Sequence, residues 1–170
     1  PIPLPAEDEV VWHARLGDVV KCKDAFTSVC EGERVNGTGG AYFFRDRYFA
    51  AKVRQLPRGV RRVTLVYNVG HRSCQDPTQQ DLAVVERQRG FSRAYASAAV
   101  AFLQGQGYDV SERVDMPPDD DLIYMCNAKA LVLGGGGFST LAAECLRYRD
   151  PAALILEASI DDVAAGAYDR

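Results

Sequence analysis

The chain has 170 residues, of which 47% are hydrophobic and 25% charged, and its formal net charge at pH 7 is −3. This length and composition are typical of one soluble globular domain with a full hydrophobic core. The negative charge argues against nucleic acid as the main partner, because proteins that bind the phosphate backbone usually carry a basic face. No apolar run reaches the length of about 20 residues that predicts a membrane-spanning helix.

Taken in chain order, apolar and periodic segments predict an alternation of strands and helices. They are strand 10–15, helix 42–56, strand 61–67, short helix 81–89, helix 91–104, strand 108–114, short helix 119–127, strand 128–133, helix 139–149 and strand 152–157. Residues 1–9 are predicted to be a linker or cut end, 19–40 a long loop and 161–170 a polar tail. The alternation predicts a single Rossmann-like α/β domain over residues 10–160, with an open parallel sheet flanked by helices.

The five cysteines are odd in number and show neither a CxxC pair nor the spacing of a zinc site. Cys126 and Cys145 lie in apolar runs and are predicted to be core residues, whereas Cys22 and Cys30 share a loop and could pair in a secreted protein. This usage favours a reducing, cytoplasmic compartment. The Golgi lumen is the alternative if the chain is a domain excised from a longer eukaryotic protein.

A glycine-rich turn joins strand 128–133 to the helix after it. Its residues are Gly134, Gly135, Gly136, Gly137, Phe138, Ser139 and Thr140. Without side chains in the way, backbone N–H groups at the helix N-terminus can approach an anion, and the two hydroxyls can cap the helix or donate to phosphate oxygens. The turn therefore predicts a phosphate site, with a ligand-free turn as the alternative. It is not a Walker loop, because no Gly-Lys-Ser/Thr sequence follows.

Polar residues also follow the first strand. His13 and Arg15 are two apart and share a strand face. Arg15 can bind a phosphate while Asp18 holds its guanidinium and Gly17 allows the turn. The alternative is a structural Arg15–Asp18 pair beside a satisfied His13.

Another polar loop, containing Asn68 and His71, follows strand 61–67. In open parallel sheets, ligands bind beyond the carboxyl ends of the strands. Loops 15–18, 68–72 and 134–140 are therefore expected to converge on one site.

The pattern His13-x-Arg15-x-Gly17-Asp18 after an apolar strand resembles the His-x-Arg-Arg-Gly/Thr-Asp signature of fucosyltransferases with a GT-B fold. These are the α-1,2 family, the core α-1,6 enzymes and the protein O-fucosyltransferases. The later stretch from Asp121 to Ser139 is similar to the second block of that family. The chain departs from the pattern at Leu16, where the family has a second Arg, and in its four glycines, where the family has a Ser/Asn-rich turn.

The resemblance implies the C-terminal donor domain of an inverting glycosyltransferase that needs no metal or other cofactor. It would transfer a sugar from a nucleotide sugar, such as GDP-fucose, to a glycan or glycoprotein hydroxyl, with a preceding domain binding the acceptor. Arg15 would bind the β-phosphate, His13 would lie near the nucleoside, and Asp121 would accept from the guanine edge. The glycine turn would hold the pyrophosphate.

Arg15 and Asp18 are the predicted catalytic residues, since an arginine can stabilise the leaving diphosphate. The base that activates the acceptor stays open among Asp18, Asp24, Glu31 and His71. A non-catalytic nucleotide or phosphosugar-binding module is the main alternative. A hydrolase with a Ser139 nucleophile is disfavoured, because the second glycine of Gly-x-Ser-x-Gly is missing.

Overall fold

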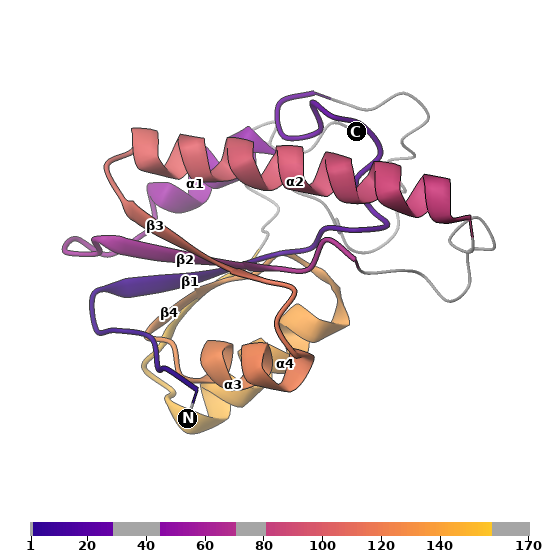
Figure 1. Ribbon diagram of the computed structural model, residues 1–170. Coiled ribbons are helices and arrows are strands. Elements are labelled where there is room, and N and C mark those ends of the chain that lie inside the picture. Colours follow the sequence, from indigo (N-terminus) through magenta and orange to yellow (C-terminus); the bar gives the residue numbers. More distant parts are fainter. Residues whose placement is uncertain (1, 29–44, 71–80, 158–170) are drawn as a thin grey trace.

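The computed structural model describes residues 2–28, 45–70 and 81–157, and Figure 1 shows them as a sheet with helices on both faces. The sheet consists of β1 (Glu9–Ala14), β2 (Arg62–Tyr67), β3 (Asp109–Val114), β4 (Ala130–Val132) and β5 (Leu154–Leu156). The helices are α1 (Asp46–Val53), α2 (Leu82–Gly105), α3 (Pro118–Cys126) and α4 (Gly136–Arg149). The predicted Rossmann-like α/β fold with an open parallel sheet is confirmed.

All strand pairs are parallel, and the strand order is β3-β2-β1-β4-β5. The chain first builds outward from β1 to β3 and then crosses back, so that β4 pairs with the other side of β1. In the register, Trp12 lies opposite Val132, and His13 lies opposite Val66 of β2. The carboxyl ends of β1 and β4 therefore meet where the strand order reverses, which is the usual place for a ligand in such sheets.

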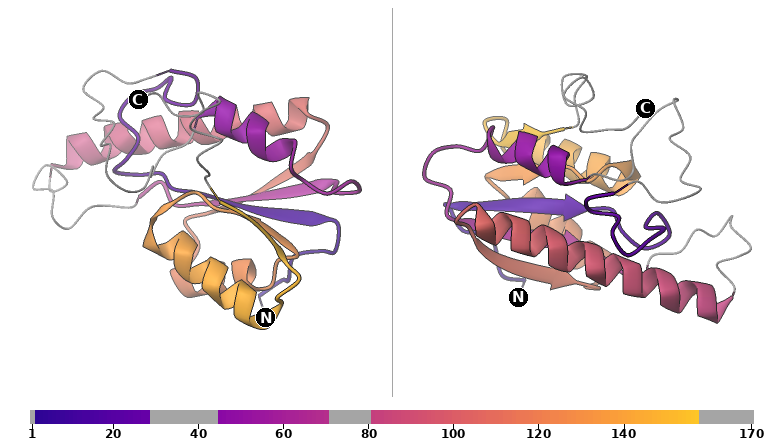
Figure 2. Two further views of the ribbon diagram at one scale, coloured as in Figure 1. Left: turned by 180° about the vertical axis from the view of Figure 1, so that it is seen from behind. Right: turned by 90° about the horizontal axis from the view of Figure 1, so that it is seen from above.

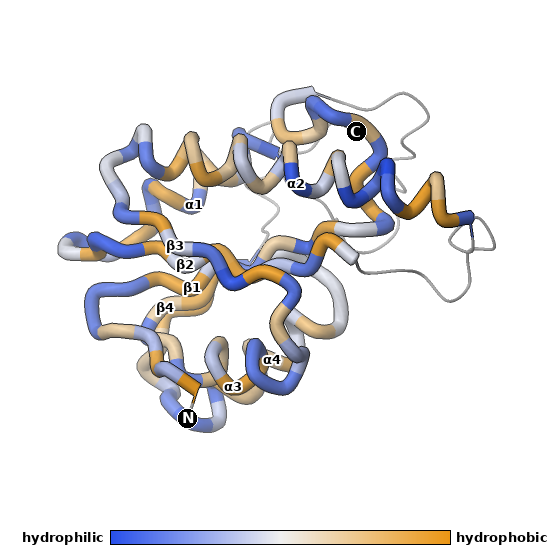
Figure 3. Tube along the Cα trace, viewed as in Figure 1, coloured by the Kyte–Doolittle hydropathy of each residue, from blue (hydrophilic) through white to orange (hydrophobic). Residues whose placement is uncertain are grey.

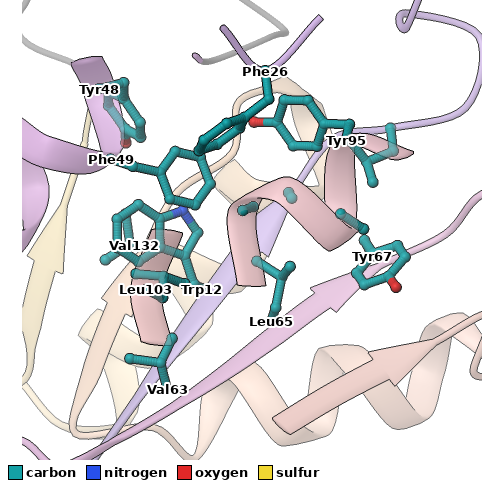
Figure 4. Packing of buried hydrophobic residues seen from close by; sticks show 14 of the residues in the cluster. Trp12, Phe26, Tyr48, Phe49, Val63, Leu65, Tyr67, Tyr95, Leu103 and Val132 are labelled. Carbon is teal, nitrogen blue, oxygen red and sulfur yellow. The ribbon is translucent and has the colours of Figure 1, made fainter. Parts of the chain in front are cut away.

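The larger core lies between the sheet and the layer of α1 and α2 (Figures 1 and 4). Trp12 of β1 stacks on Phe49 of α1 with their ring centroids 4.4 Å apart. Phe26 packs edge-on against Phe49 and against Tyr95 of α2. Phe26 belongs to the segment predicted as a long loop, so the described part of that segment, up to residue 28, contributes to the core.

A second core lies on the opposite face of the sheet, beneath α3 and α4. Val11 of β1 and Leu131 of β4 are fully buried there against Met125 and Leu146. The left-hand view of Figure 2, seen from behind, again shows helices on both sides of the sheet. Because β1 is buried on both faces, successive side chains face different helix layers, and His13 shares the α3/α4 side with Val11.

The two helices predicted over 81–89 and 91–104 are one continuous helix, α2. Gly90 lies in its interior and does not end it, because buried residues such as Val85 and Ser92 anchor the helix on either side. Asp81 caps the N-terminus, where its carboxylate accepts from the Ala83 N–H at 2.8 Å. Polar and apolar stretches alternate along α2 (Figure 3). In the described part of the chain, no helix is both long and apolar enough to cross a membrane.

Several helices and strands begin or end at other residues than predicted. Helix α1 ends at Val53, three residues before the predicted end, and residues 42–44 lie outside the described part. Strand β4 has only three residues, and helix α4 begins at Gly136 instead of residue 139. Two of the four glycines thus form the first turn of α4 rather than a loop before it.

A disulfide joins Cys126, the last residue of α3, to Cys145 in α4. Their Cα atoms are 5.5 Å apart, within the usual range for a disulfide. Cys126 is a buried core residue as predicted, and Cys145 is half-buried. Their disulfide was not predicted; the packing of α3 on α4 brings the two sulfur atoms together. The disulfide also removes the reason for favouring a reducing compartment. The predicted pairing of Cys22 with Cys30 involves a residue outside the described ranges.

Candidate functional site

A pocket of about 730 Å³ opens at the carboxyl edge of the sheet, beside the ends of β1 and β2 and the beginnings of α3 and α4. The predicted site residues that line it are His13, Arg15, Asn68, Asp121, Gly135, Gly136, Gly137 and Phe138. The three loops expected to converge thus do so. The lining residues that the sequence analysis did not single out include Val66, Tyr67, Gly70, Met116 and Pro118.

The glycine turn forms one wall of this pocket. Gly135 and Gly136 both have φ of 80°, a backbone conformation that favours glycine. Gly135 precedes α4 as its N-cap residue and offers no capping side chain. The first backbone N–H groups of α4 therefore have no helical partner, and they carry the partial positive charge of a helix N-terminus at the pocket wall.

Arg15 lines the pocket just beyond the end of β1 and is held by an ion pair. Its Nη2 donates to Asp18 Oδ1 at 2.9 Å, and the two side chains are 22% and 13% exposed. Gly17, with φ of 81°, makes the turn between them, and its N–H donates to Ser92 Oγ of α2. Asp18 and Gly17 are not among the pocket-lining residues. They fix the turn that places Arg15 at the pocket.

His13 is a buried polar residue of the pocket and faces α4. The residue is 7% exposed, and its Nδ1 lies 2.6 Å from Ser139 Oγ. The Phe138 ring lies 5.7 Å from the imidazole, centroid to centroid. Burial, with the nearby Arg15 charge, lowers the pKa of His13 to about 4. The imidazole is therefore neutral at pH 7.

Three residues predicted to contact a phosphate lie outside the pocket lining. Ser139 is 1% exposed and faces His13. Thr140 is exposed, and its hydroxyl donates to the Gly136 carbonyl at 3.3 Å. Gly134 packs against the backbone of His13. Neither hydroxyl lines the pocket, and the burial of Ser139 further weakens the hydrolase alternative, which needs an accessible nucleophile.

Asp121 lines the pocket from α3, but one of its oxygens is already occupied. Arg113 Nε donates to Asp121 Oδ1 at 3.0 Å, and the guanidinium lies 4.3 Å above the centre of the Tyr124 ring. Burial raises the pKa of Asp121, while Arg113 counteracts that rise. The sequence analysis missed Arg113, because nothing in its strand pattern distinguishes it from a solvent-facing charge.

The loop after β2 is held by the end of β3. The Val69 N–H donates to Asp115 Oδ1 at 2.8 Å, and the Gly70 N–H donates to Asn68 Oδ1 at 2.8 Å. Asp115 has φ of 52°, which is uncommon for a residue other than glycine. The next residue, Met116, enters the pocket lining.

Of the residues proposed as an acceptor base, two lie in the described part of the chain. Asp18 is engaged by Arg15, and Asp24 is exposed and outside the pocket lining. Glu31 and His71 lie outside the described residues. The described pocket thus supplies no unengaged carboxylate among the predicted candidates for this role.

Comparison with known proteins returns little for this chain. No family model matches it, and no curated protein matches it. Among solved structures, a universal stress protein from Archaeoglobus fulgidus is similar at 17% sequence identity and a TM-score of 0.36, over 92% of this chain and 93% of that chain. The predicted resemblance to fucosyltransferases is wrong: no family model supports it, and this similar structure is a universal stress protein. The assignment to a GT-B donor domain is withdrawn with it.

Proposed function

We propose that the pocket at the carboxyl edge of the sheet binds a phosphorylated ligand of the nucleoside diphosphate class, nucleotide sugars included. The observation that carries the proposal is the convergence of hydrogen-bond donors and positive charge on one pocket. Arg15 and the N-terminus of α4 both border it, and the glycines of the turn leave the backbone N–H groups of α4 uncovered. Guanidinium groups and helix N-termini are the two protein features that favour phosphate most directly.

The remainder of the pocket suits a nucleoside. Val66, Met116 and Phe138 supply apolar surface against which a base or ribose can pack. Asp121 offers a carboxylate oxygen that can accept from a base N–H group. The volume of about 730 Å³ falls within the range of roughly 300–1,000 Å³ that is usual for small-molecule sites.

Calorimetric titration of the chain with GDP, UDP, ADP and pyrophosphate, with and without a chelator, tests this proposal. Arg15→Ala is expected to weaken binding about 10- to 100-fold, since a hydrogen bond to a charged group contributes roughly 1.5–3 kcal/mol. The matched control is Arg62→Ala, because the Arg62–Asp8 ion pair lies at the amino end of β2, at the opposite edge of the sheet. Absence of binding to all four compounds, or equal losses in the two variants, would overturn the proposal.

Glycosyl transfer from a nucleotide sugar to a glycan or other hydroxyl is a second proposal. The observation that favours it is the position of Arg15 beside the N-terminus of α4, since the two together can stabilise a departing diphosphate. Incubation with UDP- and GDP-sugars without acceptor, followed by detection of the released diphosphate, tests it. Release that Arg15→Ala abolishes would support a transferase. Tight binding without release would instead support a non-catalytic binding module.

A further inference from the structure

We propose that Ser139 fixes the imidazole of His13 in the tautomer with its proton on Nε2, so that His13 presents a neutral hydrogen-bond donor to a phosphate oxygen of the ligand. The identity of the ligand depends on the proposed function, whereas the tautomer of His13 does not. In this arrangement His13 is a binding residue and Ser139 is a positioning residue. The two are brought together from β1 and α4 across 126 residues of sequence.

The hydroxyl of Ser139 determines which ring nitrogen carries the proton. Ser139 is 1% exposed, and a buried hydroxyl requires an acceptor for its hydrogen. A helical serine commonly donates to the carbonyl one turn earlier, as Thr140 does to Gly136. Among the described residues, Ser139 makes no such bond, and its only hydrogen-bond partner is His13 Nδ1 at 2.6 Å. Ser139 therefore donates to Nδ1, and a neutral imidazole must then carry its proton on Nε2.

The second nitrogen of His13 is available to a ligand. His13 lines the pocket, and within residues 2–28, 45–70 and 81–157 nothing hydrogen-bonds to its Nε2. Nor is this atom one of the buried, unpartnered polar atoms of the described chain, which are Arg89 Nε and Arg113 Nη2. The pocket therefore receives an unpartnered N–H from a residue that is otherwise buried.

A neutral donor is well suited to this position. Arg15 already brings a full positive charge, and α4 adds its partial charge at the same pocket. An imidazolium buried beside Arg15 would be repelled and poorly solvated, whereas a neutral N–H can donate without that cost. Because the Nε2–H group can only donate, the ligand atom that it faces must be an acceptor. A phosphate oxygen meets this condition at every pH at which the phosphate is ionised.

Nuclear magnetic resonance of the imidazole nitrogens in the full ¹⁵N-labelled chain tests the tautomer directly. The chain has two histidines, so His71→Gln assigns the signals of His13. The expected pattern is a neutral ring with its proton on Nε2, unchanged between pH 8 and about 5.5. Ser139→Ala is expected to give a mixture of tautomers, and Ser139→Thr to restore one. An Nδ1–H tautomer or an imidazolium at pH 7, or no change in Ser139→Ala, would overturn the inference.

Titration with pyrophosphate and GDP tests the donor role. Ser139→Ala is expected to weaken pyrophosphate binding about 2- to 5-fold, because a ring in a mixture of tautomers carries its proton on Nε2 only part of the time. Ser111→Ala is the matched control, because Ser111 bonds to Thr64 on the sheet and does not line the pocket. Equal binding by wild type and Ser139→Ala overturns this inference and leaves the proposed function intact. Failure of the wild type to bind either compound overturns the proposed function and the donor role together.

Discussion

The backbone of Gly134 lies so close to that of His13 that a β-carbon on Gly134 would come within 2.8 Å of the His13 carbonyl carbon and 2.9 Å of Ala14 Cα. Real β-carbons do not approach backbone atoms this closely. Gly134→Ala is therefore expected to destabilise the fold by about 1–3 kcal/mol. Gly137 is the contrasting position, since a β-carbon there meets nothing within 4 Å.

Gly137→Ala is expected to leave the fold intact and to stabilise it by about 0.5–1 kcal/mol, because alanine loses less backbone freedom than glycine in a helix. Urea unfolding of both variants measures the difference. If Gly134→Ala were as stable as Gly137→Ala, the close approach between the end of β1 and the turn after β4 would be wrong.

The low pKa of His13 predicts a loss of stability in mild acid. In the unfolded chain this imidazole titrates near 6.5, whereas in the folded chain burial lowers its pKa to about 4. Between these values only the unfolded chain binds the proton, so stability is complete above pH 6.5 and falls as the pH decreases toward 4. The loss is about 3 kcal/mol at 1.36 kcal/mol per pH unit.

Urea unfolding at several pH values, for the wild type and for His13→Gln, isolates this contribution, because all other titrating groups are shared. The difference in stability between the two proteins should shrink from pH 7 to pH 4. Parallel curves for the two proteins would show that His13 titrates normally and is not buried as described.

The Arg113–Asp121 pair predicts a large effect of removing one partner. Arg113 and Asp121 have side chains only 12% and 8% exposed. Arg113→Leu leaves a buried carboxylate without its cation and is expected to cost about 3 kcal/mol at pH 7. The double variant Arg113→Leu/Asp121→Asn should recover part of that loss, since no uncompensated charge remains.

A double-mutant cycle by urea unfolding measures this coupling. The cost of Arg113→Leu should also become smaller as the pH is lowered, because burial raises the pKa of Asp121 and the substitution removes the group that counteracts this rise. Additive effects of the two substitutions would show that the pair contributes no coupling energy.

The disulfide between Cys126 and Cys145 predicts an oxidation-dependent part of the stability. The two residues are 19 positions apart, and closing a loop of this size contributes about 3 kcal/mol in the chain-entropy model. Cys126→Ala/Cys145→Ala is expected to lower the urea midpoint of the oxidised protein accordingly. Mass spectrometry of non-reduced peptides identifies the bond. Recovery of both cysteines as free thiols from the oxidised protein would contradict the disulfide.

The sheet was predictable because each strand is a short apolar run between turn residues, and strands separated by helices must pair in parallel. Gly90 was misleading, since a single glycine in a helix costs only about 1 kcal/mol and neighbouring buried residues outweigh it. The first turn of α4 was not predicted, because consecutive glycines usually indicate a loop. In the structure, α4 already begins at Gly136.

Only those parts of the site that follow from the order of strands and helices could be predicted from the sequence. Arg15 and the glycine turn follow strands, and the ends of parallel strands share one edge, so their meeting could be inferred. The contact of Ser139 with His13 depends on the rotational phase of α4, which shifts with each residue of the helix start. The short pattern from His13 to Asp18 did not identify a protein family. Its Arg15–Asp18 ion pair spans the turn at Gly17 and can hold that turn for structural reasons alone.

The strand order has a consequence for the growing polypeptide. β1, β2 and β3 are synthesised first, yet β4 must pair with β1 before α4 can bring the glycine turn and Ser139 to His13. A nascent chain released only as far as β3 lacks half of the pocket wall, and the edge of β1 that later receives β4 is still open. Contacts between such distant segments form slowly, because the intervening chain must first close a long loop. The pocket is therefore complete only once β4 has paired with β1 and α4 has packed beside it.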